Sequence, residues 1–263
     1  MNNDLIGIKN NIEHNNIMVA RTDYTIDTYF SRDKLLVLEH RALNSIYHKQ
    51  NFDELTNKTD GLVGLCAGKQ PILIIEGDLI EHKGELYLAH FNIFERFTLK
   101  EFKKRQQDGK AAFFKDAMNY ISDVRPETFL NIELKKVIDK GMEKAVMILE
   151  DKKLKNRLYD SFSAELLDIA HRVDPNGITS HHLIFYTKNN KPVTLGPHTE
   201  HVPTIYTIPY PMASGDPKMA MMYGMVNSKE KFAEVAKKSN VVGISARFDD
   251  NSKWKMIKKS FAP

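Results

Sequence analysis

The chain has 263 residues, enough for one large α/β barrel or for two small domains. Hydrophobic residues make up 42% of it and charged residues 27%, which excludes an intrinsically disordered chain. The 38 basic and 34 acidic residues leave a formal net charge of +4, too small an excess to indicate a nucleic-acid partner. It suits an anionic substrate or weak contact with a membrane surface. The single cysteine, Cys66, excludes an intramolecular disulfide and a cysteine-based metal site.

The sequence also bears on the compartment. The first residues have no basic segment followed by an apolar run, so they do not predict a signal peptide, although a processed secreted chain would look the same. No stretch approaches the roughly 18 consecutive apolar residues that a membrane span needs. We therefore expect a soluble protein of the cytoplasm. The sequence does not predict an oligomeric state.

Short apolar runs rich in β-branched and aromatic residues recur along the chain, with helical patterns between them. Such alternation is typical of a parallel sheet, and runs without a polar face indicate strands that are covered on both sides. Eight runs in a chain of this length favour a closed (β/α)8 TIM barrel, with a doubly wound open sheet as the alternative. The runs are 35–39, 71–75, 128–132, 157–162, 182–187, 204–210, 221–226 and 241–246.

The segments between the runs complete the predicted organisation. Helices are expected at 134–153, 163–173 and 228–239, the last two with Ser163 and Ser228 as N-caps. We expect one barrel catalytic domain at 35–263, preceded by a polar N-terminal extension at 1–34 and carrying a long loop at 188–203 on its active face.

Polar side chains stand at the ends of the first three apolar runs. In a (β/α)8 barrel these ends converge on one mouth, where active sites lie. Side chains at positions i and i+2 of a strand share a face, so each pair on the second and third runs can point to the barrel axis. The residues are His40 and Arg41 after the first run, Glu76 and Asp78 after the second, and Glu133 and Lys135 after the third.

Three converging carboxylates, Glu76, Asp78 and Glu133, would repel one another unless a cation lies between them. Oxygen ligands of this kind suit one hard divalent cation, Mg²⁺ or Ca²⁺. A polar turn at 81–85 followed by an apolar segment predicts a chain reversal that brings His90 near Asp78. Two histidines beside a metal and two basic side chains suit displacement at the phosphorus of a diester.

The order of these motifs resembles the glycerophosphodiester phosphodiesterase family, whose members are TIM barrels of the PLC-like phosphodiesterase type. The resemblance rests on His40-Arg41, on Glu76-x-Asp78 followed by His90, and on Ile132-Glu133-Leu134-Lys135. Downstream, Ser161-Phe162 before a helix and Val242-Gly243-Ile244 also resemble the family, so the likeness runs from about residue 35 to residue 248.

The resemblance implies roles for these side chains. His40 and His90 would be the acid and base of catalysis, and Glu76, Asp78 and Glu133 would bind the metal. Arg41 and Lys135 would hold the phosphate, and the substrate would be a small-molecule or lipid phosphodiester such as a glycerophosphodiester. All seven residues would lie at the barrel mouth.

Two alternatives remain open at this point. One is an enzyme like phospholipase D or sphingomyelinase D, which shares the same barrel. The other is a catalytically inactive barrel that serves as a binding protein. Departures from the family pattern keep them open: Ala42 follows His-Arg where glycine is usual, Phe91 follows the second histidine where aspartate is usual, and the Pro-Glu-Asn segment is absent. We interpret His181 and His182 as structural.

Overall fold

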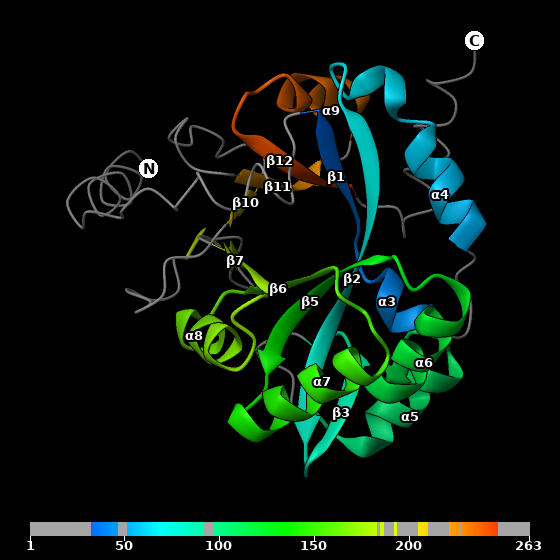
Figure 1. Cartoon of the computed structure of the whole chain (residues 1–263), viewed down its shortest axis with the longest axis vertical. Helices are drawn as coiled ribbons and strands as arrows, with labels where there is room; N and C mark the ends of the chain where they lie inside the picture. Colours follow the sequence, from blue (N-terminus) through cyan, green and yellow to red (C-terminus); the bar gives the residue numbers. More distant parts are fainter. Residues whose placement is uncertain are drawn as a thin grey trace, which may run out of the picture.

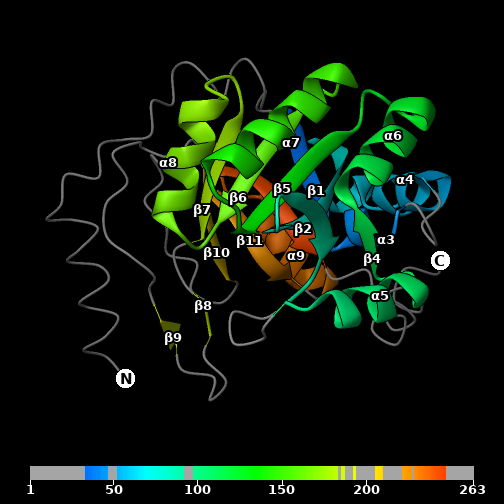
Figure 2. The same ribbon diagram turned by 90° about the horizontal axis from the view of Figure 1, so that it is seen from below.

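The structure is a computed structural model that describes residues 33–46, 52–91, 97–182, 185–186, 192–193, 205–209, 221–226 and 228–246. Strands occupy the centre of the molecule and helices lie around them (Figures 1 and 2). Eight parallel strands form the central sheet. They are β1 (Lys34–Glu39), β2 (Gln70–His82), β5 (Phe129–Lys136), β6 (Arg157–Ser161), β7 (Ile178–His182), β10 (Ile205–Pro209), β11 (Met221–Val226) and β12 (Val241–Ala246).

The strand pairings form a continuous ring. The order runs β1-β12-β11-β10-β7-β6-β5-β2, and β1 pairs in parallel with β2 as well as with β12. Each of the eight strands therefore has two parallel neighbours, as in a TIM barrel. The predicted (β/α)8 class is confirmed, and each of the eight predicted apolar runs overlaps one strand of the ring.

Helices cover the outside of the ring on the sides that the structure describes (Figure 2). Thr98, Ser163 and Ser228 are N-caps whose hydroxyls accept backbone N–H groups, so both predicted caps are confirmed. None of the described helices is long and apolar enough to cross a membrane. The helices are α3 (Ala42–Ser45), α4 (Phe52–Asp60), α5 (Leu99–Gln107), α6 (Phe114–Val124), α7 (Asp139–Asp151), α8 (Ala164–Val173) and α9 (Lys229–Ala236), with a 3-10 turn η1 at Val63–Leu65.

Alternation along the strands separates two apolar layers. One layer lies between the sheet and the helices and includes Ile75, Leu130 and Met142. The other layer is one cluster of side chains from all eight ring strands. Side chains from every strand can meet in this way only inside the barrel. Its members are Leu36, Leu38, Ile74, Phe129, Leu158, Ile178, Ile205, Met222 and Val242.

Two predicted boundaries are wrong. The helix expected at 134–153 begins at Asp139, because β5 continues through Lys136. The fifth strand is Ile178–His182, whereas the prediction placed it at 182–187. Thr179 and Ser180 interrupt the apolar pattern of this segment, but both side chains are fully buried. The Ser180 hydroxyl is 2.7 Å from the Thr207 hydroxyl on β10, so a polar pair is accommodated inside the barrel.

Three other sequence predictions fall on residues that are described only in part. Of the expected N-terminal extension at 1–34, residues 1–32 lie outside the described residues, and β1 begins at Lys34. Of the expected loop at 188–203, only the two-residue strand β9 (Pro192–Val193) is described, paired with β8 (Phe185–Tyr186). The single-domain prediction stays a prediction.

The predicted chain reversal after β2 is a β-hairpin. β2 pairs antiparallel with β3 (Glu85–Ala89), which in turn pairs with β4 (Ala111–Phe113). The two turn residues, Lys83 and Gly84, have φ of 53° and 76°, the left-handed conformation of a tight two-residue hairpin turn. Aromatic rings of Tyr87, Phe91, Phe97, Phe102 and Phe113 pack together beside the hairpin and fix its position against the barrel.

A buried ionic cluster joins the start of β6 to the end of α8. Arg157 donates to both carboxylate oxygens of Asp174, at 2.5 and 3.0 Å, and the Tyr159 hydroxyl donates to the same carboxylate at 2.7 Å. Burial acts to raise the pKa of Asp174, but the hydrogen bonds from Arg157 and Tyr159 outweigh it and lower that pKa. The cluster lies at the opposite end of β6 from the polar residues described below.

Replacing Asp174 with Asn should lower the free energy of unfolding by about 3 kcal/mol at pH 7, because it removes the buried carboxylate partner of Arg157 and leaves only the exposed Glu150, among the described residues, to pair with it. Since folding lowers the pKa of Asp174, its contribution is present above the pKa of unfolded Asp and is lost as pH falls through the folded value. Urea unfolding of both proteins should therefore converge at acidic pH. Asp151→Asn at the exposed end of α7 is the control, and a constant difference at all pH values would contradict the explanation.

Candidate active site

The interior face of the barrel changes from apolar to polar towards the C-terminal ends of the strands. Two residues after Ile74 comes Glu76, then Asp78, and two residues after Phe129 comes Asn131, then Glu133 and Lys135. The same alternation places Asp160 on β6 and Ser180 and His182 on β7. Because these positions continue the faces that form the interior cluster, their side chains converge at one mouth.

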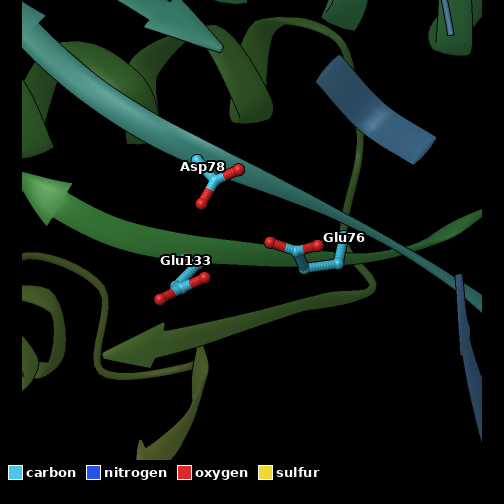
Figure 3. Close-up of side chains that lie close together, drawn as sticks. All are labelled: Glu76, Asp78 and Glu133. Atoms are coloured by element: carbon cyan, nitrogen blue, oxygen red, sulfur yellow. The ribbon is translucent and has the colours of Figure 1, made fainter. Parts of the chain in front are cut away.

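Glu76, Asp78 and Glu133 form the centre of this mouth. One carboxylate oxygen from each lies within 4.8 Å of the other two, and all three residues are buried. Figure 3 shows Glu76 and Asp78 on β2 and Glu133 on the neighbouring strand β5. Asp78 and Glu133 are direct partners in the strand register. The three residues predicted to share a site are therefore brought together.

Burial and mutual repulsion shift the pKa values of the three carboxylates. Burial, together with the charges of Asp78 and Glu133, raises the pKa of Glu76 well above its usual range. Burial also raises the pKa of Glu133, an effect that Lys135 only partly offsets. At Asp78 burial acts in the same direction, but Lys135 and the hydrogen bond from His90 outweigh it and lower the pKa.

Lys135 supplies the positive charge on the β5 side. Its Nζ contacts the Glu133 carboxylate and lies 3.3 Å from Oδ1 of Asp78. Burial alone would lower the pKa of Lys135, but the charges of Glu133 and Asp78 raise it above its usual range. The lysine therefore stays protonated, and one ammonium group faces three carboxylates.

His90 is fixed through both ring nitrogens. Nδ1 lies 3.2 Å from Oδ1 of Asp78, and Nε2 lies 2.8 Å from Nη2 of Arg41. A guanidinium can only donate, so Nε2 accepts and the ring proton is on Nδ1, donated to Asp78. Asp78 is thus the group that orients His90, a role that the sequence did not reveal because Phe91 replaces the usual aspartate. Arg105 on α5 donates to the His90 carbonyl and lies over the Phe91 ring, 4.1 Å from its centre.

His40 and Arg41 follow the end of β1 and lie next to Glu76. Nε2 of His40 is 4.0 Å from Oε2 of Glu76, and its side chain is 26% exposed. The backbone N–H of Arg41 donates to the same carboxylate oxygen. Arg41 holds a left-handed backbone conformation, with φ of 61°, which is uncommon for a residue other than glycine. This conformation directs its N–H and its guanidinium to the same site.

Sequence reasoning missed Asn44, a buried residue of α3. Its Nδ2 donates to Oδ2 of Asp78 at 2.8 Å, and its Oδ1 accepts the backbone N–H of Asp78 at 3.0 Å. Gly77 allows this close approach, because a Cβ there would lie 2.7 Å from Cβ of Leu43 and 2.8 Å from Oδ1 of Asn44. A signal was available, since a glycine between two site carboxylates indicates close backbone packing.

Sequence reasoning also missed a pair further round the mouth, Asp160 on β6 and His182 on β7. Nε2 of His182 lies 2.5 Å from Oδ2 of Asp160, and Asn131 donates to the same oxygen at 3.4 Å. Burial acts to lower the pKa of His182, but the charge and hydrogen bond of Asp160 outweigh it and raise that pKa. The sequence had placed His182 at the start of an apolar run and favoured a structural role for it.

The donor set of the triad fits a hard divalent cation. All three ligands are carboxylates, and Oε1 of Glu76 is a buried oxygen with no hydrogen-bond partner among the described residues. The raised pKa values of Glu76 and Glu133 show that positive charge is still lacking after Lys135 is counted. A cation among the three carboxylates would supply that charge.

Comparison with known proteins gives no match to a protein-family model and no match to a curated protein. Solved structures do match. A glycerophosphodiester phosphodiesterase from Parabacteroides distasonis is 15% identical with a TM-score of 0.55, covering 88% of this chain and 99% of that one. One from Agrobacterium tumefaciens is 16% identical with a TM-score of 0.51, covering 81% and 96%.

A third structure, an Oleispira antarctica phosphodiesterase in complex with the product sn-glycerol-3-phosphate, is 16% identical with a TM-score of 0.52, and the match covers 86% of this chain and 96% of that one. At these identities the likeness is one of fold, and it extends over nearly the whole length of each relative. The resemblance predicted from the motifs is confirmed at that level: this chain has the (β/α)8 barrel fold of the solved glycerophosphodiester phosphodiesterases.

Proposed function

We propose that the protein is a metal-dependent phosphodiester hydrolase that acts on glycerophosphodiesters or on related head-group esters of phospholipids. The observation that carries the proposal is the buried triad Glu76, Asp78 and Glu133. His40 lies beside Glu76, His90 lies beside Asp78, and Lys135 lies beside both Asp78 and Glu133. The Oleispira relative with bound sn-glycerol-3-phosphate supports the substrate class.

The three carboxylates would hold one divalent cation, Mg²⁺ or Ca²⁺. Once bound, it would supply positive charge for the non-bridging oxygens of the substrate phosphate. Arg41 and Lys135 flank the triad from β1 and β5 and would bind the same oxygens, because a diester anion needs fixed positive charge on more than one side. These contacts orient the phosphorus towards the histidines.

The two histidines differ in their polar partners. His90 donates from Nδ1 to Asp78 and presents an acceptor at Nε2, so it is suited to remove a proton from the nucleophile. For it to do so, the Arg41 guanidinium must turn from Nε2 to the substrate phosphate. His40 lies across the triad beside Glu76 and would protonate the leaving alcohol. In-line displacement needs one such group on each side of the phosphorus.

The function is tested by a hydrolysis screen of the purified chain. We expect release of the alcohol from small glycerophosphodiesters in millimolar Mg²⁺ or Ca²⁺, loss of activity with a chelator, and recovery when the cation is restored. Lysophospholipids and sphingomyelin belong in the same screen, because preferential cleavage of these would identify a phospholipase D-like enzyme. No cleavage of any diester, together with no cation binding, would support an inactive binding barrel and refute the proposal.

A further inference from the structure

The mouth of the barrel extends beyond the residues assigned to metal, phosphate and proton transfer. Those residues lie on or directly after β1, β2, β3 and β5. Asp160 and His182 lie on β6 and β7, the next two strands round the ring. Both continue the interior face of their strands, since Asp160 follows Leu158 by two residues and His182 follows Ile178 by four. The proposed mechanism uses neither residue.

The pair is held in one geometry. Asp160 is only 2% exposed, and its Oδ2 accepts hydrogen bonds from Nε2 of His182 and Nδ2 of Asn131. The Phe162 ring lies against the imidazole, with 4.3 Å between ring centres. A ring that is hydrogen-bonded at one nitrogen and packed on one face has little freedom to rotate. His182 is thus ordered before any ligand arrives.

Nδ1 of His182 remains available. Within the described parts of the chain, the contacts of His182 use Nε2 and the ring face, and none uses Nδ1. The side chain is 20% exposed, so the imidazole is within reach of a ligand in the mouth. Because the buried Asp160 carboxylate fixes Nε2, Nδ1 of His182 points in one defined direction.

The imidazole of His182 is linked to the proposed phosphate site through the Phe162 ring. Nζ of Lys135 is 5.6 Å from the centre of the Phe162 ring, and the same ring packs against His182. A diester held at Lys135 and the triad must direct one of its two alcohol groups somewhere along the mouth. The β6–β7 side is next to Lys135.

The geometry points to His182, ordered by Asp160, as the residue that selects the alcohol of the diester by a hydrogen bond between Nδ1 and a free hydroxyl group. This inference rests on the proposed function and adds a specificity residue to it. An imidazole suits a hydroxyl in either protonation state, because Nδ1 accepts from it when neutral and donates to it when protonated. Phe162 would pack against the carbon chain that carries this hydroxyl.

The test compares two substrates that differ only in hydroxyl groups: glycerophosphocholine and propyl phosphocholine. The quantity measured is the ratio of their kcat/KM values. We expect the wild type to favour the hydroxylated ester, and His182→Gln to reduce that ratio about tenfold, the loss typical of one hydrogen bond. Gln can still reach Asp160 from the position of Nε2 but has no group at Nδ1. His182→Asn, with an amide near the position of Nδ1, should retain more of the ratio.

Several outcomes would overturn the inference. One is a wild-type ratio in His182→Gln, whether both kcat/KM values stay the same or fall equally; an equal fall would indicate a role in chemistry or folding. His171→Gln on α8 is the matched control and should keep the wild-type ratio. Cation-induced stabilisation of each variant shows that the barrel and triad are intact. A loss of that stabilisation in His182→Gln would assign the histidine to the metal site and also count against the inference.

A binding experiment separates this inference from the proposed function. The ring signals of His182 can be followed by NMR during titration with sn-glycerol 3-phosphate and with inorganic phosphate, in the presence of Mg²⁺. A shift with glycerol phosphate that exceeds the shift with phosphate supports the hydroxyl contact, even in a protein without hydrolytic activity. Equal shifts, or none, would refute it. Absence of hydrolysis with a clear shift would refute only the enzymatic proposal.

Discussion

Replacing His90 with Ala should lower kcat/KM for the best diester by on the order of 10²-fold or more, the usual contribution of a positioned acid or base. His40→Ala should have a loss of the same order. The reason is the geometry of the triad: His90 is fixed by Asp78, and His40 lies beside Glu76, so neither can replace the other. Combining the two substitutions should cost little more than either alone, because the residues act in one step.

The two histidines can be told apart by the leaving group. A p-nitrophenyl ester leaves readily without being protonated, so the loss in His40→Ala should shrink on that substrate if His40 protonates the alcohol. The loss in His90→Ala should remain, because the nucleophile still has to be deprotonated. The reverse pattern would exchange the roles. Wild-type rates in either single variant, with normal cation binding, would refute the two-histidine mechanism.

His171→Ala on α8 is the matched control for these measurements, since it removes a histidine far from the mouth in the fold. It should retain full activity.

Arg41 links the two histidines, because it follows His40 in the chain and contacts Nε2 of His90. An Arg41→Lys variant would keep the charge but lose the fork geometry, and it should raise KM more than it lowers kcat.

The sequence was informative wherever two independent regularities agreed. Glu76 and Asp78 ended an apolar run at a spacing of two, and barrel geometry places strand ends together, so the triad could be predicted before any coordinates. The same reasoning brought His90 to Asp78, because the turn and the following apolar segment indicated a hairpin. These inferences needed only the period of a strand and the direction of the sheet.

The sequence was less informative where polar residues are buried inside the barrel. Thr179 and Ser180 have no exposed surface, yet a polar segment after a turn is normally read as a loop. The fifth strand was therefore placed too late along the chain, and His182 was put at its start instead of at its end. Helix boundaries failed for a related reason: Leu134 and Lys136 fit a helical pattern, but pairing with β2 keeps them in the strand.

Asn44 could not be predicted because it depends on packing between distant segments. It lies 34 positions before Asp78 in the chain and makes two hydrogen bonds with that residue. Only the close approach of α3 to β2 over Gly77 brings them together. Gly77 indicates that another segment approaches β2 closely, but neither this glycine nor the strand period identifies Asn44 as the residue that makes the contact.

Replacing Glu76 with Gln should have two opposite effects on stability, and this pair of effects tests the metal site. Without a divalent cation the variant should be more stable than the wild type, because it removes one of three crowded buried carboxylates. With Mg²⁺ or Ca²⁺ the wild type should gain stability, by about 2.7 kcal/mol at a cation concentration 100 times the Kd. The variant should gain little.

The pH dependence of the cation effect has a definite sign. Because the pKa of Glu76 is raised by folding, its contribution to the stability of the metal-free protein is present below the pKa of an unfolded Glu. That contribution is lost as pH rises through the folded value. A cation replaces the proton, so the stabilisation by Mg²⁺ or Ca²⁺ should increase over the same window. Thermal unfolding with and without cation from pH 5 to pH 8 measures it. Glu85→Gln, the same charge change on the exposed end of β3, should behave as the wild type. If Glu76→Gln responds to the cation as strongly as the wild type, the triad does not hold the metal.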